Sequence, residues 1–226
     1  MLSPKLVLID LDGTLVDSVP DLAFAIDEMM RQLHMPARGE DAVRHWVGNG
    51  MQRLVERALS NDIDGYPNPA LFARGIPLFM AAYAQNTCQH SRLYAGVLEG
   101  LDFLQSCQGL KIGCVTNKAA QFTQPLLTTL GLIDRFEIVI SGDTLAEKKP
   151  HPLPLLYAAE HFGVTPAESL MIGDSRSDVQ AARAAGFKVI CMSYGYNHGE
   201  DIRDYHPDAV IHSMTELPQY IDCLAV

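Results

Sequence analysis

Side chains that could do chemistry follow four of the apolar runs in this 226-residue sequence. If these runs are strands of an open α/β sheet, their carboxyl ends meet at one edge, where such sheets bind their ligands. The sequence therefore predicts that carboxylates, a hydroxyl and a lysine converge on one crevice. The residues are Asp10 and Asp12 after the first run, Thr116 and Asn117 after the second, Lys149 after the third, and Asp174 and Asp178 after the fourth.

This set of residues suits phosphoryl transfer. Several carboxylates in one crevice repel each other unless a cation neutralises them, and ligands that are all oxygen favour Mg²⁺. One carboxylate can attack phosphorus to form an aspartyl-phosphate, and a second, two residues along, can protonate the leaving oxygen and later activate water. A threonine hydroxyl, backbone N–H groups and a lysine ammonium can hold the phosphoryl oxygens, over which the charge is spread.

The elements that must position these side chains alternate along most of the chain. Short apolar runs rich in branched residues are typical of strands buried on both faces, and the segments between them have helical periodicity. This alternation, from about residue 97 onward, predicts a doubly wound, mainly parallel, Rossmann-like α/β sheet. The expected strands are Lys5–Asp10, Lys111–Thr116, Phe136–Ser141, Ser169–Gly173, Lys188–Met192 and Ala209–Ile211, and the expected helices are Ala119–Leu130, His151–Phe162, Arg176–Ala185 and Met214–Leu224.

Residues 17–90 break this alternation. Ala, Leu and Met recur there at three- and four-residue spacing, and no strand-like run occurs among them. We therefore expect an all-α cap domain at 17–90, inserted into a core domain made of residues 1–16 and 91–226. Its expected helices are Val19–His34, Asp41–Val47, Met51–Leu59 and Pro69–Asn86.

Four ordered motifs resemble those of the haloacid dehalogenase superfamily. Residues 7–18, with Asp-Leu-Asp-Gly-Thr at 10–14, resemble its first motif, and residues 115–117, Val-Thr-Asn, resemble its second. Lys149-Pro150 is similar to the third motif, and Gly173-Asp174 with Asp178 to the fourth. The resemblance covers essentially the whole chain. It implies an α/β core with a helical cap, and Mg²⁺-dependent hydrolysis of a phosphomonoester through an aspartyl-phosphate.

The same resemblance implies a role for each motif residue. Asp10 would be the nucleophile and Asp12 the acid/base. The Mg²⁺ ligands would be the carboxylate of Asp10, the backbone carbonyl of Asp12 and the carboxylate of Asp174. Asp178 would orient the site from behind these ligands. The residues that the resemblance implies for phosphate binding are Thr116, Asn117 and Lys149.

A narrower resemblance concerns the substrate. Residues 44–50, 116–118 and 122–127 are similar to the corresponding segments of phosphoglycolate phosphatases. This implies that the substrate is a small phosphorylated metabolite, 2-phosphoglycolate, which is hydrolysed to glycolate and phosphate. Other capped members of the superfamily remain alternatives: a pyrophosphatase, a sugar-phosphate phosphatase or a phosphoglucomutase. A non-catalytic phosphoacceptor module is an alternative of another class.

The cap segment offers candidates for substrate specificity. The N–H groups of the turn Gly48-Asn49-Gly50 and the amide of Asn49 could bind a carboxylate of the substrate, with Arg44 adding positive charge nearby. The simpler interpretation is that the turn only joins two helices and that Arg44 is a surface cation. Both interpretations stay open at this point.

Composition and charge exclude several other classes. The net charge is −10 and no cluster of Lys and Arg occurs, which argues against binding to nucleic acid. No apolar run approaches the roughly 18 residues that span a membrane, and the N-terminal residues do not resemble a signal peptide. We expect a cytoplasmic protein, either a monomer or a homodimer. The five cysteines lack C-x-x-C spacing, and we expect them to be reduced and mostly buried.

Overall fold

The computed structural model describes residues 1–223 and contains a six-stranded sheet in which every neighbouring pair of strands is parallel. The strands are β1 (Leu6–Ile9), β4 (Lys111–Val115), β5 (Ile138–Ile140), β6 (Ser169–Gly173), β7 (Lys188–Met192) and β8 (Ala209–Ile211). Their order in the sheet is β5-β4-β1-β6-β7-β8. The strands after β1 are added first on one side of it, as β4 and β5, and then on the other, as β6, β7 and β8, so the strand order reverses between β1 and β6. The predicted doubly wound α/β fold is confirmed.

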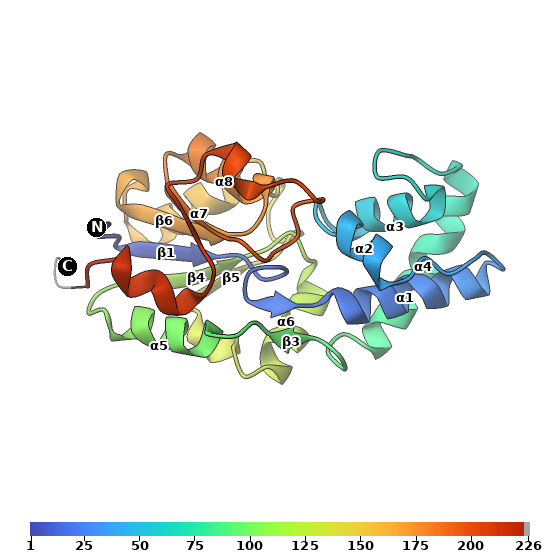
Figure 1. The fold of residues 1–226 in the computed structure, drawn as a ribbon, viewed down its shortest axis with the longest axis horizontal. Helices are drawn as coiled ribbons and strands as arrows, with labels where there is room; N and C mark the ends of the chain where they lie inside the picture. The colour runs from blue at the N-terminus through green and yellow to red at the C-terminus, as the bar shows by residue number, and fades with distance from the viewer. Residues whose placement is uncertain (224–226) are drawn as a thin grey trace.

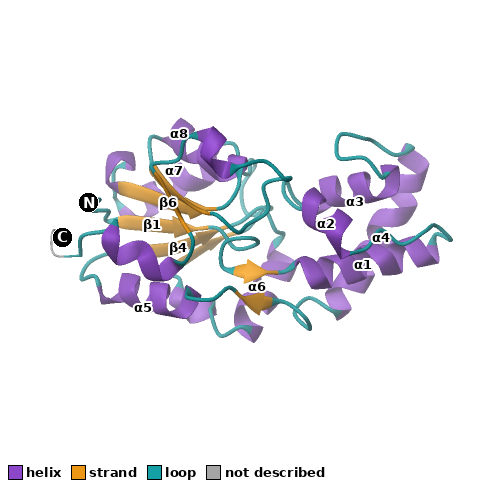
Figure 2. Ribbon diagram, viewed as in Figure 1, coloured by secondary structure: helices purple, strands orange, loops and turns teal. Residues whose placement is uncertain are grey.

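Helices cover both faces of this sheet (Figures 1 and 2). They are α5 (Val97–Ser106) and α6 (Ala120–Thr129) on one face, and α7 (Leu153–Phe162) and α8 (Arg176–Ala185) on the other. In β1, Val7 and Ile9 pack in the core on the first face, whereas Leu6 and Leu8 pack in the core on the second. All four side chains are fully buried, which stabilises the fold by roughly 1.5–3 kcal/mol each.

Two helical segments differ from the predicted pattern. The sequence pattern does not predict α5, because its interior Gly100 lowers the helical signal. That glycine is required by packing, since a Cβ there would lie 2.4 Å from the Cβ of Met214. The helix expected at Met214–Leu224 is instead a short 3₁₀ helix, η4 (Met214–Gln219). Pro218 lies inside it and lacks the N–H group that an α-helix would need there.

The predicted all-α cap lies between β1 and α5 along the chain and beyond the carboxyl ends of the strands (Figure 1). Its helices are α1 (Val19–Gln32), α2 (Glu40–Trp46), α3 (Met51–Ser60) and α4 (Pro69–Gln85). They enclose a core of their own, to which Phe122 and Tyr196 of the α/β core also belong. Two unpredicted strands, β2 (Val16–Asp17) and β3 (Arg92–Leu93), pair antiparallel where the chain enters and leaves the cap. Two residues are too few to give a strand pattern in a sequence.

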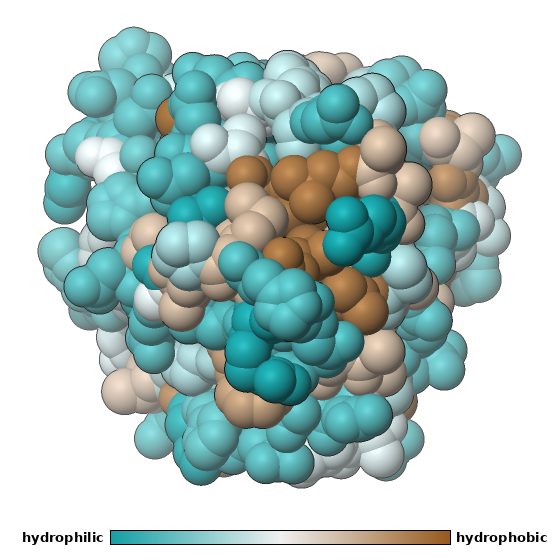
Figure 3. All heavy atoms as spheres, turned by 90° about the vertical axis from the view of Figure 1, so that its right-hand side faces the viewer, coloured by the Kyte–Doolittle hydropathy of each residue, from teal (hydrophilic) through white to brown (hydrophobic). Residues whose placement is uncertain are grey.

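The outer end of the cap exposes some apolar surface. Figure 3 views this end and shows an area of hydrophobic side chains bordered by hydrophilic ones. Phe24 is 47% exposed, and Met35 and Phe72 are only partly buried. A unit of four helices has too much surface for its volume to bury every apolar side chain. No helix within residues 1–223 is both long and apolar enough to cross a membrane.

The expectation that all five cysteines are reduced is wrong for two of them. Cys107 and Cys223 form a disulfide, with Cα atoms 4.8 Å apart. The two residues are 116 positions apart in the sequence, and only the return of the chain from η4 to the end of α5 brings them together. Spacing in the sequence carries no signal of such a contact. Cys88, Cys114 and Cys191 are free, and the last two are buried, as expected.

Candidate active site between the sheet and the cap

A cavity lies where the carboxyl ends of β1, β4 and β6 face the cap, at the point where the order of the strands reverses. Every predicted site residue of the core lines this cavity except Asp178, which lies behind it. The α/β core contributes Asp10, Asp12, Thr116, Asn117, Lys118, Ala119, Phe122, Lys149, Asp174, Ser175, Ser177 and Tyr196, and the cap contributes Leu22, Val47, Gly48, Asn49, Gly50, Met51, Leu54, Phe79 and Tyr83.

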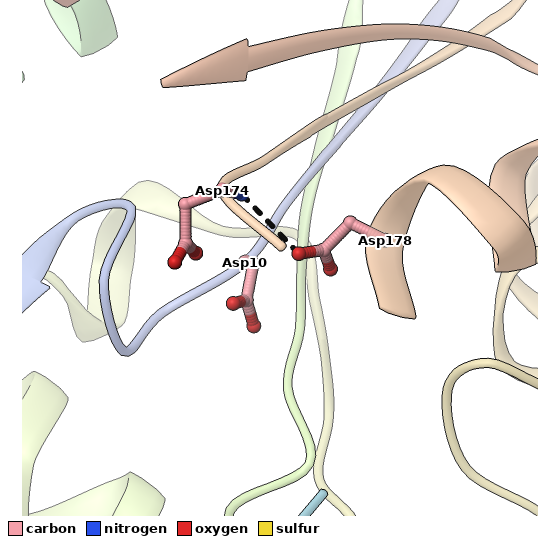
Figure 4. Close-up of side chains that lie close together, drawn as sticks. All are labelled: Asp10, Asp174 and Asp178. Carbon is pink, nitrogen blue, oxygen red and sulfur yellow. Dashed lines mark hydrogen bonds between the residues drawn. The ribbon is translucent and has the colours of Figure 1, made fainter. Parts of the chain in front are cut away.

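Three buried carboxylates converge at the core side of the cavity (Figure 4). Asp10 follows β1, Asp174 follows β6, and Asp178 lies in the first turn of α8. Each offers a carboxylate oxygen, and the three oxygens lie within 4.8 Å of one another. The close approach confirms that neighbouring strands bring together residues more than 160 positions apart.

Asp174 is held in place by groups from two loops. Its Oδ1 accepts a hydrogen bond from the hydroxyl of Thr14 at 2.7 Å, and its Oδ2 accepts one from the backbone N–H of Tyr196 at 2.5 Å. Gly13 has a φ of +91° and packs directly against the carboxylate, since a Cβ there would lie 2.3 Å from Oδ2. Only glycine fits this position, because it tolerates the left-handed backbone and leaves room for the carboxylate.

Asp178 holds other groups in place from behind the cavity. Its Oδ2 accepts hydrogen bonds from the backbone N–H groups of Asp174 and Ser175 and from the hydroxyl of Ser175, which begins α8 in a capping box. Its Oδ1 accepts a hydrogen bond from Lys149 at 2.7 Å. Asp178 is fully buried, and both of its oxygens are occupied by protein donors.

Lys149 joins the carboxylates to β4. Its Nζ donates to Oδ1 of Asp10, to Oδ1 of Asp178 and to the backbone carbonyl of Val115, each at 2.7 Å. An ammonium group has three N–H donors, so these contacts use all of them. Burial opposes the charge, but the two carboxylates outweigh that effect and raise the pKa of Lys149 above its usual value. Lys149 therefore carries a fixed positive charge beside Asp10.

Burial dominates the electrostatics of the carboxylates. It raises the pKa of Asp10 to about 7, with a further upward contribution from Asp178, while Lys149 opposes the rise. Burial also raises the pKa of Asp174 well above its usual value, and the negative charges of Asp10 and Asp178 add to that rise. A cluster of this kind favours either bound protons or a bound cation.

The donor set fits Mg²⁺. Asp10 and Asp174 present buried carboxylate oxygens to the cavity, and a hard divalent cation prefers oxygen ligands of this kind. Lys149 contacts only one oxygen of Asp10, and the protein donors on Asp174 leave each of its oxygens a further lone pair. Asp178 is less suited to direct ligation, because its oxygens already accept from Lys149, Ser175 and the backbone. This arrangement agrees with the implied division between metal ligands and a residue behind them.

Asp12 lies at the cavity two residues after Asp10 and has two protein partners. The hydroxyl of Ser18 donates to its Oδ1 at 2.5 Å, and Nζ of Lys118 lies 2.9 Å from both of its carboxylate oxygens. The side chain of Asp12 is 16% exposed. It therefore faces the cavity as a solvent-accessible carboxylate, the position that an acid/base needs.

Thr116 and Asn117 follow β4 and both line the cavity. Thr116 is 3% exposed, and its hydroxyl accepts a hydrogen bond from the backbone N–H of Lys118 at 3.2 Å. The side-chain N–H₂ of Asn117 donates to the carbonyl of Lys149 at 2.8 Å and so ties the loop after β4 to the lysine loop. The hydroxyl proton of Thr116 is free to donate toward the cavity.

The cap turn Gly48-Asn49-Gly50 also lines the cavity. All three residues have positive φ, at 124°, 62° and 89°, which suits two glycines and an asparagine. The Asn49 side chain is engaged, because its Oδ1 accepts from Arg57 at 3.1 Å and its N–H₂ donates to the hydroxyl of Ser177 at 3.4 Å. The turn thus connects the cap to α8, and its carboxylate-binding role remains a prediction.

Arg44 does not line the cavity, so of the two open interpretations the structure gives no support to a contact between Arg44 and the substrate. Its guanidinium donates to both carboxylate oxygens of Asp17 at 3.1 Å and pairs with Glu40 at 2.8 Å. It also lies 5.5 Å from the ring centre of Tyr196. Asp17 of β2 provides the opposite charge that draws Arg44 toward the strands joining cap and core. Arg44 is therefore a contact of that junction in this structure.

Three further residues that line the cavity have no role assigned from the sequence, namely Lys118, Tyr83 and Tyr196, although Lys118 lies within the segment 116–118 that carries the narrower resemblance. Lys118 directly follows Thr116-Asn117, so the rule that locates the other site residues at strand ends also locates this one. Tyr83 belongs to α4, and Tyr196 to the loop after β7. Neither tyrosine is near a motif, and only the packing of the cap on the core brings them to the cavity. No signal in the sequence identifies them.

The family model for haloacid dehalogenase-like hydrolases matches residues 7–192, which include all four motifs. The chain belongs to this hydrolase family. The sheet order, the inserted cap and the strand-end carboxylates are consistent with that membership.

Comparison with individual proteins gives a narrower likeness. The chain is 63% identical over 214 residues to a phosphoglycolate phosphatase of Nitrosococcus oceani, covering 95% of each chain. It is 50% identical over 212 residues to a phosphoglycolate phosphatase of Thiobacillus denitrificans, covering 94% of this chain and 93% of the relative. A crystal structure of a predicted phosphoglycolate phosphatase from Haemophilus somnus 129pt superposes with a TM-score of 0.90 at 36% identity, covering 97% and 98% of the two chains.

Proposed function

We propose that the protein is a Mg²⁺-dependent phosphatase that hydrolyses 2-phosphoglycolate to glycolate and phosphate through an aspartyl-phosphate. The observation that carries the mechanism is the arrangement of Asp10 and Asp12. The first carboxylate is buried against Lys149 at 2.7 Å, and the second faces the cavity two residues away. Similarity to relatives named phosphoglycolate phosphatase supports the substrate.

The first half-reaction transfers the phosphoryl group to Asp10. A carboxylate oxygen of Asp10 attacks phosphorus and forms the acyl phosphate bond, while the bond from phosphorus to the glycolate oxygen breaks. Asp12 in its protonated form gives that oxygen its proton, so glycolate leaves as the alcohol. In the second half-reaction Asp12 accepts a proton from water as the water attacks phosphorus, which releases phosphate and restores the Asp10 carboxylate.

The other residues of the core hold the phosphoryl group. Thr116 offers its hydroxyl proton, and the loop residue Asn117 lies beside it in the same wall. Lys149 places a positive charge next to Asp10, where negative charge would otherwise oppose the approach of an anion. Mg²⁺, held by Asp10, the carbonyl of Asp12 and Asp174, would supply further positive charge for the phosphoryl oxygens.

A panel of phosphate esters, with pyrophosphate as an anhydride, tests this proposal. We expect phosphate release from 2-phosphoglycolate in the presence of Mg²⁺, with kcat/KM at least about tenfold above that for a hexose phosphate, pyrophosphate or an aryl phosphate. Excess chelator should abolish the activity, and added Mg²⁺ should restore it, whereas Ca²⁺, with its larger and looser ligand shell, should work poorly. A hexose phosphate or pyrophosphate that leads the panel would refute the substrate but not the mechanism. Stable phosphoprotein without turnover would favour the phosphoacceptor module instead.

The proposal also covers the cellular location of the enzyme, its oligomeric state and its domain boundaries. We propose a cytoplasmic enzyme that is either a monomer or a homodimer, with the cap at residues 17–90 and the core at 1–16 and 91–226. Light scattering after size-exclusion chromatography measures the oligomeric state. Limited proteolysis that cuts near residues 17 and 90 would support the boundaries, whereas first cuts within α1–α4 would contradict them.

A further inference from the structure

Lys118 is a buried cation that the proposed mechanism does not use. Its side chain is 5% exposed, and its backbone is fixed by three hydrogen bonds. The N–H of Lys118 donates to Thr116, and its carbonyl accepts from the N–H of Gly142 and from the hydroxyl of Thr123. Burial opposes its charge, but the carboxylate of Asp12 outweighs that effect and raises the pKa of Lys118 above its usual value. Lys118 therefore presents a fixed positive charge to the cavity.

The two lysines that line the cavity differ in what they can still bind. Lys149 donates to three acceptors of the protein and has no N–H left. The ammonium group of Lys118 contacts one carboxylate, that of Asp12, and has three N–H donors for its two oxygens. Lys118 can thus bind a further anionic oxygen next to Asp12 without giving up its present contact.

Tyr83 of the cap lies against Lys118 and has an unused hydroxyl. The ring centre is 5.1 Å from Nζ of Lys118, and Tyr83 is 1% exposed. Within residues 1–223, its hydroxyl oxygen has no hydrogen-bond partner of acceptable geometry. Burial raises the pKa of Tyr83 to about 12, and the charge of Lys118 opposes that rise, so the hydroxyl keeps its proton at neutral pH. A buried hydroxyl without a partner is costly, unless a ligand supplies the acceptor.

The surroundings of this pair are apolar. The rings of Phe79 and Phe122 pack against Tyr83, with their centres 5.7 Å and 4.8 Å from its own, and Leu22 and Leu54 also line the cavity. In such a setting an ammonium and a phenol hydroxyl are strong anchors for an anion, because little water competes for them. A neutral alkyl group would instead contact the apolar side chains.

We infer that Lys118 and Tyr83 together bind the carboxylate of the substrate, an inference that rests on the proposed function. When phosphorus lies at Asp10, the leaving oxygen must lie at Asp12, which protonates it. In 2-phosphoglycolate a single methylene joins that oxygen to the carboxylate. The acid group therefore lies just beyond Asp12, where Lys118 is the neighbouring donor and Tyr83 closes the space from the cap. Lys118 and Tyr83 are specificity-determining residues for an acid next to the ester.

The test compares two substrates that differ only in the acid group, 2-phosphoglycolate and ethyl phosphate. The measured quantity is the ratio of their kcat/KM values in the wild type and in the variants Lys118→Met and Tyr83→Phe. We expect Lys118→Met to lower the ratio at least about tenfold, and Tyr83→Phe to lower it by about threefold to tenfold. A role of Lys118 limited to positioning Asp12 would lower both kcat/KM values equally and leave the ratio unchanged.

Lys148→Met provides the matched control. Lys148 is the other lysine near the cavity mouth; its Nζ lies beside Gly50 of the cap turn, and it does not line the cavity. Loss of its charge should change the ratio by less than about twofold, because Lys148 does not line the cavity and solvent screens a partly exposed charge.

The outcomes separate this inference from the proposed function. A wild-type ratio near one would overturn the proposed substrate and the inference with it. A high wild-type ratio that persists in both Lys118→Met and Tyr83→Phe would overturn the inference alone. Calorimetric binding of the two esters to the Asp10→Asn protein gives a second measurement without turnover. There, adding Lys118→Met should weaken binding of 2-phosphoglycolate and leave that of ethyl phosphate nearly unchanged; equal weakening of both would contradict the inference.

Discussion

The cavity has a core wall, formed by residues of the α/β core, and a cap wall, formed by residues of the cap, and different interactions hold the side chains of each wall in place. On the core wall, charged side chains such as Asp174, Asp178 and Lys149 each have two or three partners from separate strands and loops. On the cap wall, most residues are apolar, and Leu54 and Phe79 belong to the hydrophobic core of the cap. Buried charges require an interlocking set of partners, whereas apolar side chains require only shape. The core wall is therefore suited to fixed chemistry, and the cap wall to selection among substrates.

This comparison makes a general prediction about variants. Substitutions in the core wall should lower turnover of every phosphate ester, because they affect groups that act on phosphorus itself. Substitutions of the apolar side chains and of Tyr83 in the cap wall, and of Lys118 where the two walls meet, should instead change the ranking of the esters.

Asp10→Asn should cause the largest loss. An amide cannot form the acyl phosphate, so kcat should fall by at least about ten-thousand-fold with every ester in the panel. Thermal unfolding should remain cooperative, because Asn keeps the shape of the buried side chain. Asp204→Asn, at an exposed carboxylate that does not line the cavity, serves as the control and should keep wild-type activity. Near-normal turnover by Asp10→Asn would refute its role as nucleophile.

Asp12→Asn should have a smaller effect that depends on the leaving group. Loss of the acid should lower kcat by about a hundredfold to ten-thousand-fold for 2-phosphoglycolate, whose alkoxide leaves poorly. An aryl phosphate needs less protonation of its leaving oxygen, so release of the phenol in a single turnover should slow much less. Rapid-quench measurements of phenol release and phosphate release separate the two half-reactions. Equal losses for both esters in the first half-reaction would contradict an acid role for Asp12.

Removal of Mg²⁺ should affect stability in a pH-dependent way. Burial raises the pKa of Asp10 from 3.8 to about 7, so without metal the folded state favours the protonated carboxyl. Its contribution to the free energy of unfolding is present below about pH 4 and is lost as the pH rises to about 7. Mg²⁺ requires the deprotonated form, so the increase in Tm on adding it should be several degrees at pH 8 and less than about half as large at pH 5.5.

At each pH the measured quantity is the Tm with Mg²⁺ minus the Tm without it. Groups remote from the site contribute equally to both values, so their contributions cancel in this difference. Asp174→Asn should abolish this difference at both pH values, because it removes a carboxylate that would hold the ion. An increment as large at pH 5.5 as at pH 8 would contradict coupling between metal and protons at the Asp10 cluster.

The core wall and the cap wall of the cavity also differ in how well the sequence predicts them. The core wall is predictable because its residues stand at the ends of apolar runs, and parallel strands place such ends side by side. Asp10, Asp174 and Lys118 can all be located in this way, although the position of Lys118 at a strand end does not by itself give its role. Tyr83 cannot be located in this way, because its place depends on how α4 packs over the strand ends. Periodicity shows that a helix has a buried face but not what that face covers.

Arg44 and the disulfide illustrate the same limit. Arg44 is near the cap turn in sequence, but its partner Asp17 belongs to the short β2 strand, which carries no pattern of its own. Cys107 and Cys223 meet only because the chain end returns to α5. In both cases a local pattern predicts the element, while a contact between distant elements determines what the residue does.

A substitution of Asn49 should have the smallest effect. It also distinguishes two candidate sites for the carboxylate of the substrate, the cap turn and the pair Lys118 and Tyr83. Asn49→Gly is the suitable change, since glycine keeps the positive φ of 62° and removes only the side chain. Its amide already bonds Arg57 and Ser177, so its loss should loosen the contact between cap and core. We expect kcat/KM to fall by less than about tenfold, and equally for 2-phosphoglycolate and ethyl phosphate.

Ser177→Ala removes the partner of Asn49 on α8 and is the matched variant. If the contact between Asn49 and Ser177 serves to close the cap, the two single variants should have similar effects, and the double variant should be little worse than either. A preference for 2-phosphoglycolate that narrows in Asn49→Gly but persists in Lys118→Met would reverse the assignment. The acid group would then be bound by the cap turn, and selection among substrates would depend on the cap wall alone.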